Sequence, residues 1–127
     1  MVAAVAAAAL LARSPLTPLV GTWIGHTRTL QVTRAGTARE VVDDGCCTFV
    51  VALDLKLSHP RRVGRETVAT ATVVHVRVGD RKSFPPGRKP PRVGDVGTLR
   101  LRGQIVTDSL TGDIYCGPRA RAGACGA

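Results

Sequence analysis

Four cysteines are the residues of this chain whose types and spacing point most clearly to chemistry. Cys46 and Cys47 are adjacent, whereas Cys116 and Cys125 lie near the C-terminus. An even number of cysteines in a small chain is typical of a disulfide framework formed in an oxidising compartment. A structural zinc site requires two close pairs such as Cys-x-x-Cys, and neither pair here has that spacing. The cysteines therefore predict a disulfide-bonded protein outside the cytosol.

The pairing of these cysteines has two possible forms. Neighbouring residues of a strand point to opposite faces, and a disulfide between them requires a strained peptide. The simplest arrangement therefore joins Cys46 and Cys47 to the C-terminal segment, one to Cys116 and one to Cys125, closing loops worth about 4–5 kcal/mol each in the chain-entropy model. The alternative is a local bond between Cys116 and Cys125, which leaves Cys46 and Cys47 as a redox or metal site.

His26 and Arg28 are the polar residues most suited to binding a ligand. They share their parity with the apolar residues of the alternating segment 24–33. One unbroken strand would point both inward at the mouth of a barrel, where they could hold an anionic group. The alternative is that Gly25 marks a bulge that turns them outward.

Signatures of catalysis or of a bound cofactor are missing from the sequence. It contains no Gly-x-Ser-x-Gly motif and no pair of carboxylates in a catalytic arrangement. His59 and His75 have no second histidine or carboxylate at ligand spacing. We therefore expect a non-catalytic protein without metal or cofactor.

The chain is strongly basic, with a formal net charge of +9. The charges are spread along the chain, Arg far outnumbers Lys, and no strand combines basic and aromatic residues that could stack on bases. This pattern argues against nucleic-acid binding. An anionic cell-envelope component, a small ligand or a protein target remain as partners.

Period-2 alternation predicts strands along most of the chain. The clearest strand covers residues 47–57, with Phe49 on the apolar face, and we expect His59-Pro60 to end it. Further strands are expected at residues 67–78, with Val68, Val74, Val76 and Val78 inward, and at 98–102, 104–107 and up to Cys116. These strands predict an all-β fold, a small antiparallel meander closing into a barrel of six to eight strands or a two-layer sandwich.

The two ends of the chain differ from this β region. Residues 1–12 are apolar, too few to span a membrane of ~20-residue helical thickness but similar to the central region of a secretory signal. The alternative is an Ala-rich helix packed on the domain. We divide the chain into residues 1–20 as a signal remnant or apolar segment, 21–117 as the barrel with a Pro-rich basic loop at 79–95, and 118–127 as a tail tied by Cys125.

Two resemblances accompany these patterns. Gly-Thr-Trp at residues 21–23 resembles the Gly-x-Trp start of lipocalin-type and avidin-type barrels, which implies that Trp23 has a structural role at the closed end of a barrel. The segments 21–28, 44–47, 94–102 and 107–117 together resemble small secreted proteins of high-GC Gram-positive bacteria. That resemblance implies a location and a fold but no chemistry.

These observations favour a secreted, disulfide-stabilised, non-catalytic binding or cell-envelope-associated module. One alternative is a secreted protein–protein inhibitor that presents the Pro-rich loop at residues 83–91, and another is a redox or metal-binding protein acting through Cys46 and Cys47. A binder of small molecules should contain a cavity at the His26 end of the barrel. An inhibitor should have a filled interior and a rigid exposed loop.

Overall fold

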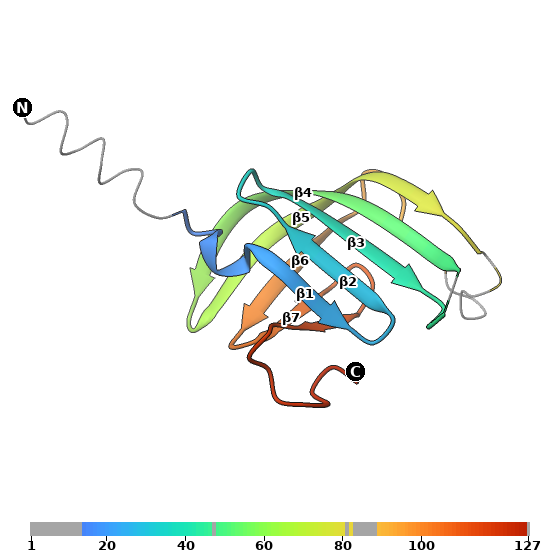
Figure 1. The fold of residues 1–127 in the computed structure, drawn as a ribbon. Coiled ribbons are helices and arrows are strands. Elements are labelled where there is room, and N and C mark those ends of the chain that lie inside the picture. The colour runs from blue at the N-terminus through green and yellow to red at the C-terminus, as the bar shows by residue number, and fades with distance from the viewer. Residues whose placement is uncertain (1–13, 47, 81, 83–88, 127) are drawn as a thin grey trace, which may run out of the picture.

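The chain folds into a closed barrel of eight antiparallel strands (Figure 1). The computed structural model describes residues 14–46, 48–80, 82 and 89–126. After a short 3-10 helix, η1 (Thr17–Leu19), come β1 (Gly21–Gly25), β2 (Arg28–Val32), β3 (Thr37–Asp43), β4 (Phe49–Val63), β5 (Glu66–Val78), β6 (Val96–Arg102), β7 (Ile105–Asp108) and β8 (Ile114–Cys116). Each strand pairs with its neighbour in sequence, and β1 pairs with β8. The prediction of a meander closing into a barrel is confirmed.

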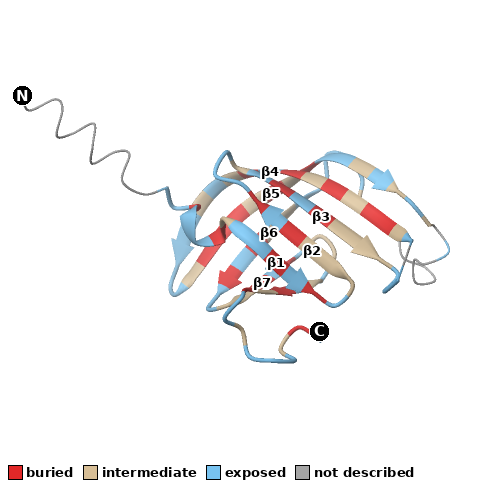
Figure 2. Cartoon of the chain, viewed as in Figure 1, coloured by how far each residue is buried: buried red, intermediate tan, exposed pale blue. Residues whose placement is uncertain are grey.

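The core fills the inside of the barrel with aliphatic side chains. Buried and exposed residues alternate along the strands, as the red and blue bands of Figure 2 show. In β4 the inward side chains include Leu53, Leu55 and Leu57, which belong to the predicted apolar face. Burying such side chains stabilises the fold by roughly 1.5–3 kcal/mol each relative to full exposure.

The first predicted strand, residues 24–33, is wrong, because the chain reverses direction within it. His26 and Thr27 form a turn between β1 and β2, and Gly25 pairs with Arg28. Thr27 has a φ of 57°, a left-handed conformation that β-branched residues rarely adopt. The usual two-residue hairpin signals, Asn-Gly or Asp-Gly, are missing here, so the turn gave no warning in the sequence.

The predicted end of β4 at His59-Pro60 is also wrong. The strand continues to Val63, and its register against β5 shifts between Ser58 and Arg61. His59 takes a φ of 48° at this irregularity. Proline is tolerated within a sheet at a bulge, where its missing N–H is not needed.

A second register shift changes which residues of β5 face the core. The register changes opposite Asp54 and Leu55, and Val74 becomes 49% exposed rather than inward. Val73 occupies the core instead. Phe49, also predicted inward, is half-buried outside the main core, with the Arg77 guanidinium 4.7 Å from its ring centroid.

The barrel has two different ends. At the first, the capped end, η1 lies beside the turns at residues 33–36, 64–65 and 103–104. Leu16 and Leu19 join the core there, and Trp23 Nε1 donates a hydrogen bond of 2.9 Å to the Leu19 carbonyl oxygen. We call the other end, with the turns at 26–27 and 109–113, the cavity end.

Candidate ligand-binding site

A cavity of about 710 Å³ opens at the cavity end of the barrel. Its walls come from residues 27–28, 42–44, 50–51, 89, 91 and 109–113. Val42, Val50 and Leu110 contribute apolar surface, whereas Ser109 and Thr111 contribute hydroxyl groups. Ligand sites in proteins have this size, and they typically combine apolar walls with a few polar groups.

Arg28 is the basic side chain that β2 contributes to the cavity. Its side chain is 23% exposed and forms an ion pair with Asp113, which precedes β8 in the 109–113 turn. Its Nε also donates a hydrogen bond of 2.9 Å to the His26 carbonyl oxygen. Gly25 makes room for this arrangement, because a Cβ there would lie 2.7 Å from Arg28 Cγ and 2.6 Å from the Ile114 carbonyl oxygen.

His26 and Arg28, the two candidate residues predicted from the sequence, lie in different surroundings. Arg28 lines the cavity, as an inward residue was expected to do. His26 is exposed in the turn and is not among the cavity residues. Gly25 is not a bulge but the last residue of β1, paired with Arg28.

Sequence reasoning missed a buried polar layer beneath the cavity. Glu40 and Asp108 are 1% and 0% exposed, and Tyr115 is 0% exposed. Tyr115 Oη donates a hydrogen bond of 2.6 Å to Glu40 Oε1. The available signal was parity, because Glu40 stands between Ala38 and Val42 on the inward face of β3.

Glu40 holds a proton near neutral pH. Burial first, and then a hydrogen bond to Asp108 and its negative charge, raise the pKa of Glu40 to about 9. The other oxygen of Glu40, Oε2, is buried and accepts no hydrogen bond within the described part of the chain. A proton on this carboxyl removes the conflict, because a neutral carboxyl can donate to Asp108 while accepting from Tyr115. Burial also raises the pKa of Tyr115, and the charge of Glu40 adds to that shift.

Asp108 connects this layer to the cavity. Its Oδ1 accepts a hydrogen bond of 2.8 Å from the Leu110 backbone N–H, and its Oδ2 accepts one of 3.2 Å from Thr111 Oγ1. These bonds hold the turn at 109–113, which forms one wall of the cavity. Arg28 acts on the layer as well, because its positive charge offsets part of the rise in the pKa of both Glu40 and Tyr115. The buried layer therefore shapes the cavity without lining it.

The preferred cysteine pairing is wrong. Cys116 and Cys125 are bonded to each other, with their Cα atoms 5.9 Å apart, as in the alternative pairing. Cys46 is disulfide-bonded too, so its partner is neither Cys116 nor Cys125. This bond removes the free thiol that the redox or metal alternative required at Cys46. Cys47 lies outside the described residues.

The Pro-rich loop is described only in part. Residues 81 and 83–88 lie outside the described residues, as do residues 1–13 of the expected signal remnant. Lys89 and Pro91 from the end of the loop contribute to the cavity wall. Leu16 and Leu19, from the end of the segment assigned to residues 1–20, belong to the core.

Comparisons of the chain with protein-family models, with curated proteins and with solved structures found no match. Within the described part of the chain, no three His, Cys, Asp or Glu side chains come together as a metal-binding group. The described helical structure likewise includes nothing long and apolar enough to cross a membrane. The cavity and the buried layer are therefore the features from which a function must be argued.

Proposed function

We propose that this protein is a non-catalytic binding module that holds a small amphipathic molecule in the cavity at the cavity end. The observation that carries the proposal is the cavity of about 710 Å³ at one end of a barrel whose other end is filled by Leu16, Leu19 and Trp23. An apolar body would contact Val42, Val50 and Leu110, and a polar group would face Arg28 and the 109–113 turn.

The buried layer supports a binding role over a catalytic one. Glu40 and Tyr115 have hydrogen-bonding chemistry suited to proton transfer, but both are buried away from the cavity. A general acid or base must reach its substrate within hydrogen-bonding distance or through one water. In this arrangement the layer stabilises the cavity wall rather than contacting a ligand.

The cavity also favours a binder over the alternative of a protein inhibitor. An inhibitor that presents residues 83–91 needs no internal space, whereas the end of that loop here contributes Lys89 and Pro91 to a cavity. Lys89 and Pro91 then serve as part of the mouth through which a ligand enters.

A fluorescence titration tests ligand binding. The probe is N-phenyl-1-naphthylamine, a neutral aromatic amine of suitable size whose emission rises in apolar surroundings. In the variant Val42→Phe, an added ring fills part of the cavity from β3, and we expect probe binding to weaken by at least about tenfold. The control is Val41→Phe, because Val41 precedes Val42 on the same strand and is not among the cavity residues. Equal binding by both variants, or no binding by the unaltered protein, would contradict the proposal.

Secretion is the second part of the proposed function. It is supported by the Cys116–Cys125 disulfide, since such bonds persist in oxidising compartments, and by the apolar residues 1–12. Intact-mass analysis of protein collected from the culture medium should show all cysteines oxidised and an N-terminus shortened by cleavage. Four free thiols and an unprocessed N-terminus would argue for a cytosolic protein.

A further inference from the structure

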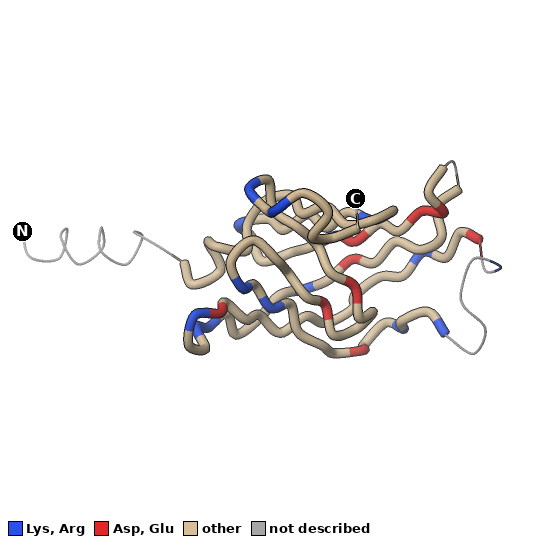
Figure 3. The backbone as a smooth tube through the Cα atoms, turned by 90° about the horizontal axis from the view of Figure 1, so that it is seen from below, with Lys and Arg blue, Asp and Glu red and all other residues tan. Residues whose placement is uncertain are grey.

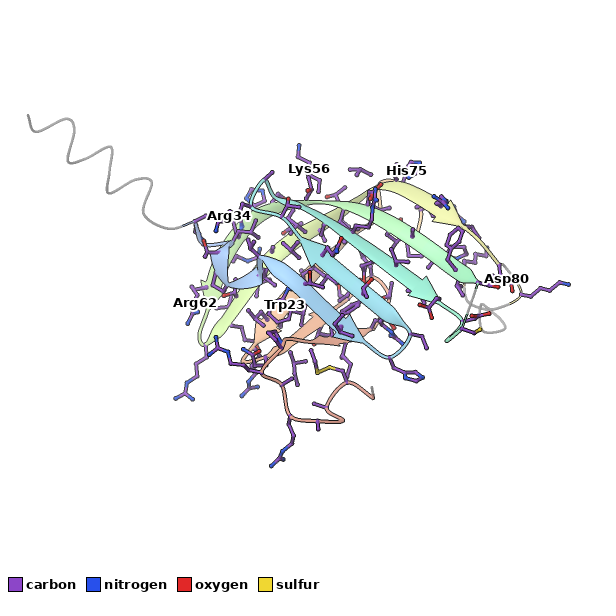
Figure 4. All side chains as sticks on the ribbon, viewed as in Figure 1. Trp23, Arg34, Lys56, Arg62, His75 and Asp80 are labelled. Carbon is purple, nitrogen blue, oxygen red and sulfur yellow. A yellow bond between two sulfur atoms is a disulfide. The ribbon has the colours of Figure 1, made fainter. Side chains whose placement is uncertain are left out.

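The capped end of the barrel carries a group of exposed arginines that the cavity does not use. In an antiparallel meander every second turn falls at the same end, so arginines distant in sequence share that end. Arg34 lies in the β2–β3 turn, Arg62 and Arg65 lie at the β4–β5 hairpin, and Arg102 ends β6. Figure 4 shows Arg34 and Arg62 projecting from the barrel at the end where η1 lies.

These arginines have no acidic partners. Glu66 is the acidic residue at the β4–β5 hairpin, and it is already paired with Arg100. In the described part of the chain, none of Arg34, Arg62, Arg65 and Arg102 takes part in a salt bridge. The capped end therefore presents uncompensated positive charge to solvent.

The charge is distributed unequally along the barrel. Asp43, Asp44 and Asp113 lie around the cavity, and Figure 3 shows most acidic positions in the half of the molecule away from the N-terminal end. Arg28 and Lys89 also lie around the cavity, so acidic and basic groups offset one another there, whereas the capped-end arginines take part in no salt bridge among the described residues. An anionic surface therefore attracts the capped end more strongly and orients the protein.

The arginines themselves identify the kind of surface. Exposed Lys and Arg side chains bind reversibly to the anionic headgroups of a membrane, and each strengthens binding roughly fivefold. This attraction does not require the apolar residues 1–12, which cleavage of a secretory signal would remove. Among the described residues, the capped end offers no exposed aromatic ring on which bases could stack, since Trp23 is buried there and Phe49 lies at the other end.

We propose that the capped end, through Arg34, Arg62, Arg65 and Arg102, docks onto the surface of an anionic phospholipid bilayer. Docking in this orientation turns the cavity away from the membrane. The surface and the cavity lie at opposite ends of the barrel, so this inference does not depend on the proposed ligand.

Vesicle co-sedimentation with the full chain tests the docking surface. The vesicles contain equal parts of phosphatidylglycerol and phosphatidylcholine, with pure phosphatidylcholine as the neutral comparison. We expect binding to the anionic vesicles that weakens as salt rises to about 0.15 M, and little binding to the neutral ones. Equal binding to both kinds of vesicle would overturn the proposal.

Two triple variants with the same loss of charge locate the surface. Arg34→Gln, Arg62→Gln, Arg65→Gln removes three charges from the capped end, and we expect vesicle binding to fall about a hundredfold, roughly fivefold for each arginine. The control, Arg77→Gln, Lys82→Gln, Arg92→Gln, removes three exposed charges toward the other end and should lose less than about fivefold. Circular dichroism checks that both variants are folded.

Three results would reject the membrane surface. Equal losses in the two triple variants would mean that net charge alone drives binding. Unchanged binding by the capped-end variant would mean that another part of the chain binds the vesicles. Tighter binding to a DNA duplex than to anionic vesicles at the same salt concentration would assign the arginines to nucleic acid instead. The N-phenyl-1-naphthylamine titration should be unchanged in both triple variants.

Discussion

The interior of this barrel has different chemistry toward its two ends. At the capped end, Leu16, Leu19 and Trp23 fill the space with apolar groups, and the polar atom of Trp23 has a backbone partner. Beneath the cavity, the interior of the barrel holds Glu40 and Tyr115. The first arrangement stabilises the fold at any pH, whereas the second makes stability depend on protonation.

The difference indicates where the molecule gives up stability for function. An all-aliphatic interior would suit a small barrel at both ends, because burying an ionisable group is unfavourable unless it is neutralised or paired. The polar layer is instead retained under the cavity, where Asp108 holds the wall formed by residues 109–113. Departures from simple core packing are expected at functional sites.

Leu16, Leu19 and Trp23 form an apolar plug at the capped end. Removing the Trp23 side chain from this plug should lower the free energy of unfolding more than any other change considered below. Trp23 is 6% exposed, and replacing a buried tryptophan with alanine typically lowers the free energy of unfolding by about 3–5 kcal/mol. Urea denaturation followed by circular dichroism measures the loss in Trp23→Ala. The neighbour Ile24 is 47% exposed, so Ile24→Ala should cost no more than about 1 kcal/mol. Similar losses in the two variants would show that the plug is unimportant.

The polar layer should make stability fall as pH rises. The pKa of Glu40 is about 9 in the folded protein, against an ordinary value of 4.5, so between these values the unfolded chain releases the proton first. The contribution of Glu40 to the free energy of unfolding should therefore be constant below about pH 4.5 and fall by up to about 1.4 kcal/mol per pH unit until about pH 9. Between pH 6 and pH 8 the loss is about 3 kcal/mol.

Glu40→Gln tests this dependence because an amide keeps the shape of the neutral carboxyl but does not titrate. Its denaturation curves should change little between pH 6 and pH 8. Asp54→Asn is the control, since hydrogen bonding to Arg39 lowers the pKa of the exposed Asp54 and its titration lies below this range. A glutamine variant that keeps the full pH slope would place the titrating group elsewhere.

The disulfide should contribute less than the plug. Cys116 and Cys125 are nine residues apart in sequence, and a loop of that size stabilises by about 2–3 kcal/mol in the chain-entropy model. The double variant Cys116→Ser, Cys125→Ser should lose this amount in urea denaturation without reductant. Trypsin cleaves after Arg119 and Arg121, so a non-reducing digest should contain one linked pair of peptides from this segment. A peptide linking Cys46 to Cys116 or to Cys125 would contradict the local bond.

The smallest expected effect on stability comes from removing one ion pair at each end of the barrel. In Arg28–Asp113 the side chains are 23% and 19% exposed, and in Arg100–Glu66 they are 44% and 22% exposed. Because solvent screens exposed pairs, Asp113→Asn should cost about 1 kcal/mol and Glu66→Gln about half of that or less. Thermal denaturation of the two variants at equal salt concentration gives the comparison. A greater loss of stability in Glu66→Gln than in Asp113→Asn would contradict the expectation that the less exposed ion pair stabilises the protein more.

The strand pattern could be predicted from the sequence where alternation is unbroken. Leu53, Leu55 and Leu57 face the core as predicted, because every second residue of a regular strand points to the same face. Prediction failed at Val74 and around His59, where the register shifts and the neighbouring residues of the strand change faces. Pro60 marks the shift near His59 in the sequence, but a proline fits a strand end as well as a bulge. No residue marks the shift at Val74, which depends on the partner strand.

The candidate site could be predicted only in part. Arg28 lies in the cavity, but the turn at His26-Thr27 separates it from its predicted partner. Glu40, Asp108 and Tyr115 come from three strands, and only the closed barrel brings their side chains together. The cysteine pairing also required the fold, because several connectivities are compatible with one set of spacings.

The closure of the barrel has a consequence for how the chain is made. The first strand meets the last through the pairing of Ile24 with Cys116, so the barrel remains an open ribbon until residue 116 has left the ribosome. Until then its aliphatic inner face and the edge of β1 are available to other chains, as in other folds dominated by distant contacts. The bond between Cys116 and Cys125 forms beside this seam, and its second cysteine is made after every strand of the barrel. Oxidation therefore secures a closure that comes late in the synthesis of the barrel.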